Sequence, residues 1–156
     1  MMEQSENILL KKAKIEVLEN DIRVLKEEIA KERGEHVKRT GYVILSEPEK
    51  YFNWERSFIT DIDIHWVNNE KSTWTDDGIW QGEYELRNWG GRQIDQQGSA
   101  WLTHATIFKT KEVAEFILKK IRASWGDRWH LYDMAQCKQI MINEPRYINS
   151  EASKAL

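Results

Sequence analysis

A seven-residue repeat of isoleucine near the N-terminus is the feature that most limits what this chain can fold into. Isoleucines recur every seventh residue from position 8, and leucines follow two of them by three residues. With isoleucine at heptad position a and leucine at d, the pattern favours a parallel, two-stranded coiled coil. We therefore expect a homodimer whose interface contains Ile8, Ile15, Leu18, Ile22, Leu25 and Ile29.

Charged residues beside the repeat indicate its register. In a parallel pair, each g position faces the e position of the next heptad in the partner chain. All three such pairs have opposite charges: Lys14–Glu19, Asp21–Lys26 and Glu28–Arg33. Each exposed pair contributes only about 0.5 kcal/mol, but all three favour the same parallel, in-register arrangement.

The same segment allows a second arrangement. Leu10, Val17 and Val24 form another apolar row with the same spacing. That row fits a single amphipathic helix lying on its own globular domain. A tetramer, or a helix pair that also docks on the domain, would use both rows.

The apolar period changes from seven to two after a glycine-bounded segment, Gly34–Gly41. We expect a dimerising helix and hinge over residues 1–40, an α+β head domain over 41–143 and a loose C-terminal tail over 144–156. The head is predicted to be a small, mainly antiparallel sheet packed by one helix.

Strands are predicted from alternating or continuous apolar runs bounded by turn residues. They cover residues 41–46, 58–67, 84–89, 105–108 and 129–134, and residues 138–143 extend or pair with the last one. Turns are expected at residues 68–71 and at Gly90–Gly91. The predicted helix begins after Thr110, a favourable N-cap, and ends at Gly126.

Composition excludes several classes of protein. The 156 residues include 23 basic and 26 acidic ones, a net charge of −3, which argues against a strongly basic nucleic-acid binder. A single cysteine, Cys137, excludes an intramolecular disulfide and a cysteine-rich zinc site. No apolar run is long enough to span a bilayer, and the N-terminus does not resemble a signal peptide. We expect a cytoplasmic protein without a membrane partner.

Catalytic motifs are not found in the sequence. Glycine-rich phosphate loops, the H-E-x-x-H zinc motif and the G-x-S-x-G nucleophile motif are all missing. Cys137 would be a nucleophile only beside a histidine, and we interpret it as a small strand residue. The sequence therefore predicts no enzyme activity, no cofactor and no metal.

One carboxylate–histidine set shares a strand face: Asp61, Asp63 and His65, opposite Ile62, Ile64 and Trp66. With help from Asp76, Asp77, His104 or His130, that set could hold a metal. We favour the simpler interpretation, a polar strand face exposed to solvent.

Tryptophan is the second unusual feature, with eight in the chain. Four of them, at positions 74, 80, 89 and 101, fall in an irregular polar segment. Such residues are either core, or anchors for a protein partner, or stacking platforms for a nucleobase. Arginines in the same segment could contact a phosphate or a carboxylate. The candidate partner-binding set is Trp74, Trp80, Trp89, Trp101, Asp61, Asp63, Asp76, Asp77, Arg87 and Arg92.

The stretch Ala105-x-x-Phe108-x-Thr110-Lys111-Glu112-x-Ala114-x-x-Ile117 resembles a pattern of small bacteriophage and mobile-element proteins. The stretches Tyr42–Ile44 and Trp74–Asp77 are similar to companions of that pattern. The resemblance implies a small α+β phage-type domain in the style of anti-CRISPR and other anti-defence proteins, which usually act by binding. It transfers no functional residue to this chain.

The leading functional hypothesis is a non-enzymatic, homodimeric binding protein of phage type. It would inhibit or sequester a host defence protein, with a CRISPR-type nuclease as the expected target. Its acidic residues could mimic phosphate charge toward a basic channel. Two alternatives remain: a sponge that captures a nucleotide signal in a Trp/Arg pocket, and a metal-dependent hydrolase using Asp61, Asp63 and His65.

Overall fold

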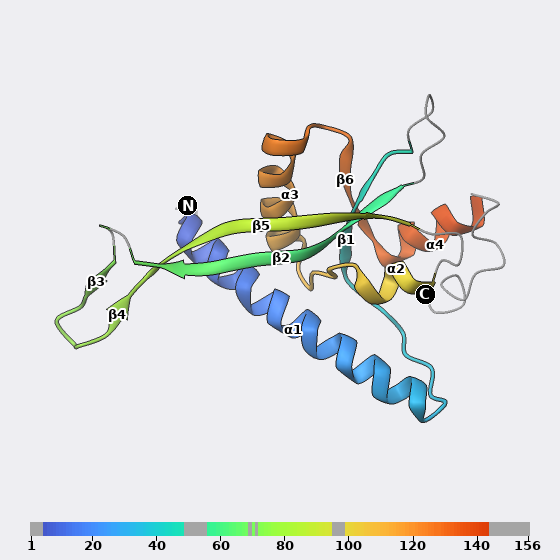
Figure 1. Ribbon diagram of the computed structural model, residues 1–156, viewed down its shortest axis with the longest axis horizontal. Coiled ribbons are helices and arrows are strands. Elements are labelled where there is room, and N and C mark those ends of the chain that lie inside the picture. Colours follow the sequence, from blue (N-terminus) through green and yellow to red (C-terminus); the bar gives the residue numbers. More distant parts are fainter. Residues whose placement is uncertain (1–4, 49–55, 69, 71, 95–98, 144–156) are drawn as a thin grey trace.

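A long N-terminal helix lies beside a four-stranded antiparallel sheet, and three further helices complete an α+β fold of the expected class (Figure 1). The structure, a computed structural model, describes residues 5–48, 56–68, 70, 72–94 and 99–143. The helices are α1 (Glu6–Glu32), α2 (Ser99–His104), α3 (Lys111–Trp125) and α4 (Met134–Asn143). The strands are β1 (Tyr42–Ser46), β2 (Ser57–Val67), β3 (Thr73–Trp74), β4 (Trp80–Gln81), β5 (Glu83–Gln93) and β6 (Trp129–Asp133).

Helix α3 begins and ends where the sequence predicted. The hydroxyl of Thr110 accepts a hydrogen bond from the Val113 amide, and Gly126 ends α3 with a φ of 95°. Both predictions are confirmed. The expectation of a strand over residues 138–143 is wrong, because α4 begins directly after β6. Asp133 and Gln136 exchange side chain–backbone hydrogen bonds of 2.7 and 2.8 Å, a reciprocal cap that starts this helix.

The main sheet has the strand order β5-β2-β1-β6, and each neighbouring pair is antiparallel. Both faces of β1 are covered. Ile44 belongs to a first core with α1 and α3, whereas Val43 and Leu45 belong to a second core with α2 and α4. This is why β1 reads as a continuous apolar run instead of an alternating one.

A β-bulge in β2 changes which side chains face the first core. The register against β5 shifts between Thr60 and Asp63, and Asp61 takes a φ of 54°. Asp tolerates this left-handed conformation better than most residues. The extra residue lets Ile59, Ile62 and Ile64 all reach the same core.

Two local predictions are wrong. Gly90 and Gly91 do not form a turn but pair with Thr60 and Ile59 inside β5. A Cβ atom at Gly91 would lie 3.0 Å from the ring of Trp125, so glycine serves close packing there. The expected strand over 105–108 is reduced to a single bridge between Tyr42 and Phe108, after the short helix α2.

The N-terminal helix is not detached from the head. Leu10 and Ala13 are buried in the first core beside α3. The segment after α1 is also tied down, because Arg39 reaches back to Glu27 of α1. The predicted tail over 144–156 lies outside the described residues. None of the helices in the described ranges has both the length and the apolar content that crossing a membrane requires.

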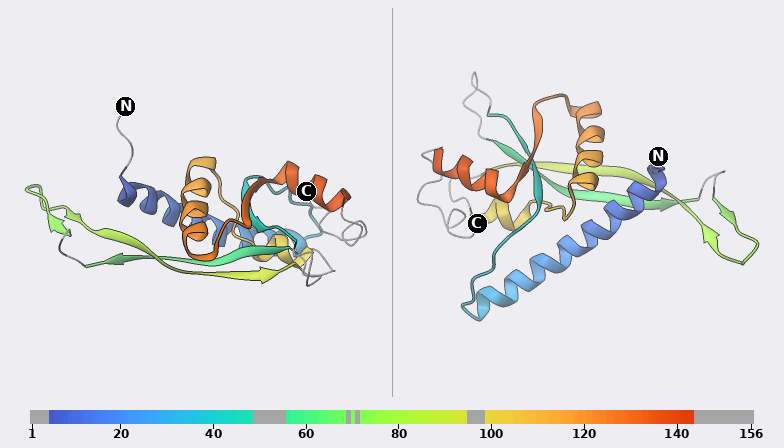
Figure 2. Two further views of the ribbon diagram at one scale, coloured as in Figure 1. Left: turned by 90° about the horizontal axis from the view of Figure 1, so that it is seen from above. Right: turned by 180° about the vertical axis from the view of Figure 1, so that it is seen from behind.

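The ribbon of β2 and β5 continues beyond the helices. Its far end carries the small β3–β4 hairpin, which projects past the N-terminal end of α1 in every view (Figures 1 and 2). Residues 66–84, which include this hairpin, are called the arm below.

Candidate binding surfaces

Hydrogen bonds fasten one face of α1 to the body. The carboxylate of Glu16 accepts hydrogen bonds from the amide and the hydroxyl of Thr110, at 3.0 and 2.8 Å. The side-chain oxygen of Asn20 accepts from the Ile107 amide at 3.1 Å. Arg23 donates to the carbonyls of Thr103 and Ala105, both at 3.2 Å. These contacts fix the rotation of α1 about its own axis.

A buried ion triad adds to this attachment. Glu27 lies between Arg23 and Arg39, with a nitrogen–oxygen distance of 2.7 Å to each. Burial lowers the pKa of Arg23, Glu27 opposes that change, and the charge of Arg39 adds to it. Because two cations share one carboxylate away from solvent, the position of α1 depends on Glu27.

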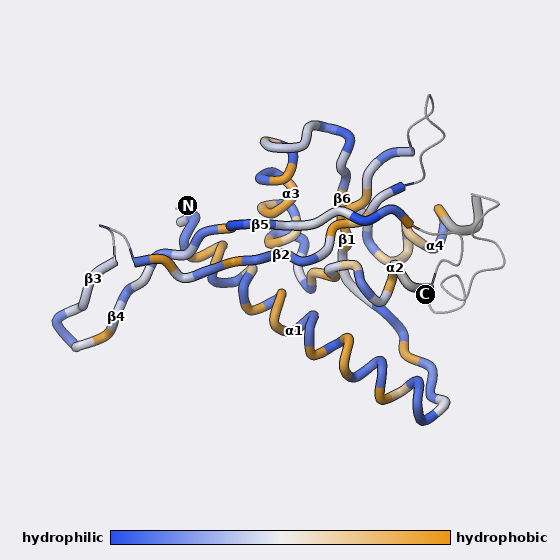
Figure 3. Tube along the Cα trace, viewed as in Figure 1, coloured by the Kyte–Doolittle hydropathy of each residue, from blue (hydrophilic) through white to orange (hydrophobic). Residues whose placement is uncertain are grey.

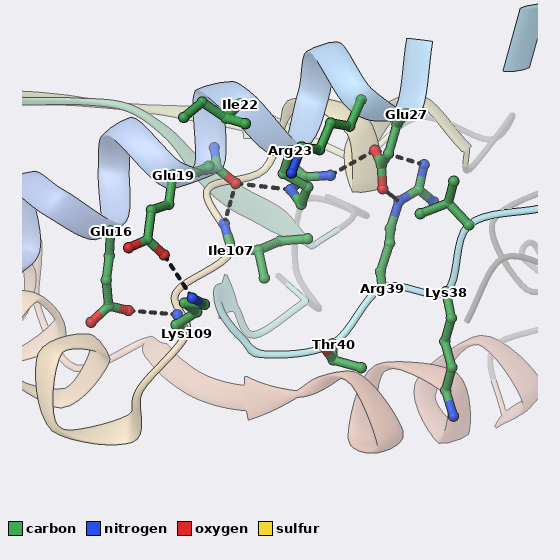
Figure 4. A pocket seen from close by; sticks show the side chains of 13 residues that line it. Glu16, Glu19, Ile22, Arg23, Glu27, Lys38, Arg39, Thr40, Ile107 and Lys109 are labelled. Atoms are coloured by element: carbon green, nitrogen blue, oxygen red, sulfur yellow. Dashed lines mark hydrogen bonds and ion pairs between the residues drawn. The ribbon is translucent and has the colours of Figure 1, made fainter. Parts of the chain in front are cut away.

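A cavity of about 440 Å³ lies between α1 and the segment over residues 37–40 (Figure 4). Several of its charged side chains already serve the attachment: Arg39 points to Glu27, and Lys109 pairs with Glu19 at 3.0 Å. The side chain of Lys38 turns away from α1 (Figure 4). Among the described residues, no aromatic side chain lines the cavity. It therefore differs from the aromatic pocket that a nucleotide sponge would need.

The opposite face of α1 carries an exposed apolar row. Figure 3 shows that hydrophobic residues recur along the whole helix. We call this row the helix stripe; its members are Ile8, Ile15, Leu18, Ile22, Leu25 and Ile29. Each is between 47% and 59% exposed. Six large apolar side chains at this exposure, all in one row, form an unusual surface for a chain that acts alone.

The tryptophans of the candidate set divide between core and surface. Trp101 is only 2% exposed and packs in the second core. Trp89 is half-buried and stacks on Trp125, which in turn contacts Trp129, with ring centroids 5.6 and 5.4 Å apart. For Trp101 and Trp89 the structure thus matches the core alternative, and neither belongs to an open surface.

The arm contains three tryptophans, and their rings contact one another. The ring of Trp80 lies 5.9 Å from that of Trp66 and 5.2 Å from that of Trp74. Trp74 is 68% exposed, and Ile79 beside it is 62% exposed. Ile79 was not among the predicted binding residues, because a lone apolar residue after Gly78 carries no periodic signal.

The acidic residues of the candidate set do not gather at one point. Asp61 lies at the bulge, whereas Asp63 pairs with His65 at 2.8 Å. Asp76 and Asp77 lie in the turn at the tip of the arm. In the described part of the chain, no three histidine, cysteine, aspartate or glutamate side chains are placed to hold a metal.

The two arginines of the set lie on β5. Arg87 pairs with Glu85 at 2.9 Å, and Arg92 is exposed. Within the part of the chain that the structure describes, neither lines a cavity together with the exposed tryptophans. The Trp/Arg pocket that the nucleotide hypothesis requires is not formed by the described residues.

Cys137 is a helix residue and not the expected strand residue. It lies in α4, buried in the second core. Burial raises the pKa of its thiol to about 12, and the charge of Asp133 adds to this. The thiolate that a nucleophile requires is therefore scarce at neutral pH.

Comparison with known proteins gives no relative: no family model, no curated protein and no solved structure matches the chain. The likeness to small phage proteins remains an expectation from sequence, and function is inferred from the surfaces alone.

Proposed function

We propose that this chain is a non-enzymatic binding protein that works as a homodimer, joined through the helix stripe by a parallel coiled coil. The observation that supports the proposal is the division of α1 into two faces. The buried side chains occupy heptad positions b, c and f, as in Glu16, Leu10 and Ala13. Positions a and d, which a coiled coil needs, are the exposed ones.

The attachment of α1 leaves the stripe no partner within its own chain. Turning the stripe inward would break the bonds of Glu16, Asn20 and Arg23 to the body and expose Leu10 and Ala13. A second copy supplies a matching stripe. In a two-fold pair the two bodies lie on opposite sides of the paired helix stripes, so neither body blocks the contact between them.

The residues beside the stripe support the parallel register. Asp21, Lys26, Glu28 and Arg33 are exposed, so the two C-terminal g–e pairs are free to form. In the third pair, Lys14–Glu19, the carboxylate of Glu19 also pairs with Lys109 of its own chain. It would therefore be shared between two lysines. The charges thus remain complementary in the folded chain.

The expected target is a host defence protein, with a CRISPR-type nuclease as the leading candidate. Two features favour a protein target of this kind: exposed aromatic and apolar side chains on the arm, and acidic residues around them. Nucleic-acid channels of nucleases are basic, and an acidic surface is attracted to them. The phage-type resemblance of the sequence points the same way.

Light scattering at micromolar concentration tests the dimer. We expect twice the chain mass of 18.6 kDa for the parent and the single mass for Ile22→Asp, which places a charge in the seam. Ile79→Asp is the matched control, because it makes the same substitution at an exposed residue outside the stripe. A parent of single mass, or equal behaviour of both variants, contradicts the proposal.

Affinity capture from a bacterial lysate, followed by mass spectrometry, tests the target. We expect a nuclease effector that the parent retains and inhibits, and that Trp74→Ala loses. A nucleotide retained instead, or a metal-dependent turnover lost in Asp63→Asn, would support one of the alternative functions.

A further inference from the structure

The arm differs in charge from the rest of the molecule. Residues 66–84 contain four of the chain's 26 acidic residues but only one of its 23 basic ones. Asp76 and Asp77 at the tip form no ion pair with any cation in the described ranges. A partner of the arm must therefore supply positive charge, and nucleic acid is disfavoured by repulsion.

The arm is also held in one shape. At its tip the amide of Thr75 donates to the carbonyl of Ile79 at 2.8 Å, and the Thr75 hydroxyl accepts from the Ile79 amide at 3.1 Å. Gly78, with a φ of 79°, completes the turn. Below the tip, Trp80 packs between Trp66 and Trp74. A surface ordered in advance loses little conformational entropy when it binds.

Two adjacent carboxylates at this tip lie between an exposed indole and an exposed aliphatic side chain. Trp74 and Ile79 flank the turn that carries Asp76 and Asp77. Arginine suits such a surface best, because its planar guanidinium stacks on an aromatic face and pairs with a carboxylate. We propose that the arm is a docking surface for an arginine-rich segment of a protein partner.

The base of the arm is joined to the start of the helix stripe. The side chain of Asn7 donates to the carbonyl of Gly82 at 3.2 Å and accepts from the Tyr84 amide at 2.9 Å. Ile8, the next residue, is the first member of the stripe. In a parallel pair both arms therefore leave the same end of the molecule. This part of the inference rests on the proposed dimer: two arms bind two basic segments of one partner at once.

A fluorescent nona-arginine peptide tests a single arm in the full-length protein. We expect Trp74→Ala to weaken binding about tenfold. Asp76→Asn with Asp77→Asn, which changes no packed side chain, is expected to weaken it severalfold. Glu112→Gln with Glu115→Gln removes the same charge from α3 and is the matched control, with a change below about twofold.

Several outcomes overturn the docking surface. These are no binding by the parent, equal losses in the arm and α3 variants, or tighter binding of an oligothymidine probe. Circular dichroism shows whether Trp74→Ala keeps its fold. If it does not, the aspartate pair alone decides, because its side chains support no packing.

A second peptide, with two nona-arginine segments on a flexible glycine–serine linker, tests the paired arms. We expect the parent to bind it about 100-fold tighter than the single peptide. Ile22→Asp should retain the single-peptide affinity but lose this gain. A dimer without the gain overturns the paired arrangement. A monomeric parent that still binds the single peptide overturns the proposed dimer and leaves the docking surface intact.

Discussion

At the scale of single residues, Glu27 carries more of the fold than its place in the sequence indicates. It is the only carboxylate within ion-pairing distance of both Arg23 and Arg39 in the described structure. Charged side chains in a helix normally face solvent, so the burial of this one could not be expected from its residue type. Glu27 occupies heptad position f, on the same side of the helix as the apolar row of Leu10, Val17 and Val24 at position c. That shared side is the only sign in the sequence that Glu27 faces the body.

Glu27→Gln should strongly destabilise the protein. The change leaves two buried guanidinium groups without their counter-charge, and we expect the free energy of unfolding to fall by about 3 kcal/mol or more. Urea unfolding followed by tryptophan fluorescence, at fixed protein concentration, measures this. Glu35→Gln, at an exposed position, should change the value by less than about 0.5 kcal/mol. Equal effects would show that the triad does not hold α1.

Cys137 should make the protein less stable in alkali. The unfolded thiol has a pKa of about 8.5, and burial raises the folded pKa to about 12. The folded state therefore keeps the proton while the unfolded state loses it. This contribution is complete below about pH 8, and it is lost as pH rises toward 12. Cys137→Ala should lack that component of the pH profile, and the parent thiol should resist alkylation at pH 8 until the chain unfolds.

At the scale of elements, α1 is a structural part of the head as well as a candidate interface. Its inner face closes the first core with Leu10 and Ala13, next to α3. Its outer face stays open to solvent. One helix therefore carries two different apolar rows, as its sequence allows. The inner row packs in the head, and the outer row is exposed and available to a second chain.

Deleting residues 1–36 should unfold the head or leave it loosely packed. The truncation exposes the first core and leaves Arg39 without Glu27. Near-ultraviolet circular dichroism reports whether the tryptophans keep a fixed environment. A truncated chain with the parent spectrum would mean that the head folds alone, as the change of period after residue 40 suggested.

Much of the fold could be predicted from residue patterns. Thr110 and Gly126 mark the ends of α3, and strand β2 matches the alternating run at residues 58–67 closely. Other elements depend on contacts that a local pattern does not contain. Gly90 and Gly91 look like a turn, yet both pair inside β5, and the missing side chain of Gly91 makes room for aromatic rings from α3 and β6.

The candidate site could be predicted only in part. The helix stripe is a strict repeat, so its residues were found, and the structure leaves them exposed. For the tryptophans the sequence could not separate core from surface. Trp74 and Trp101 have similar polar neighbours, but only Trp101 meets a second layer of helices. That distinction arises from tertiary packing.

At the scale of the whole molecule, the orientation of the two chains in the proposed dimer is the decisive question. Lys11 and Glu32 hold d positions near opposite ends of α1. In a Cys137→Ala background, Lys11→Cys and Glu32→Cys should each form a disulfide dimer under mild oxidation, because matching d residues approach closely in a parallel pair. An antiparallel pair would separate matching cysteines by about 31 Å, and only a mixture of the two variants would crosslink.

The bridge made by Asn7 has a thermodynamic consequence. It ties the base of the arm to the first turn of α1. Binding at the tip of the arm and self-association through the helix stripe would therefore both act on the same pair of hydrogen bonds. Linkage is reciprocal: a ligand that strengthens self-association by some factor is itself bound more tightly by the associated form, by the same factor. Asn7→Ala removes these two hydrogen bonds and leaves the exposed side chains of the arm tip and the helix stripe unchanged. That variant should therefore keep the single-peptide affinity but lose part of the gain that the paired arms of the proposed dimer give the two-segment peptide.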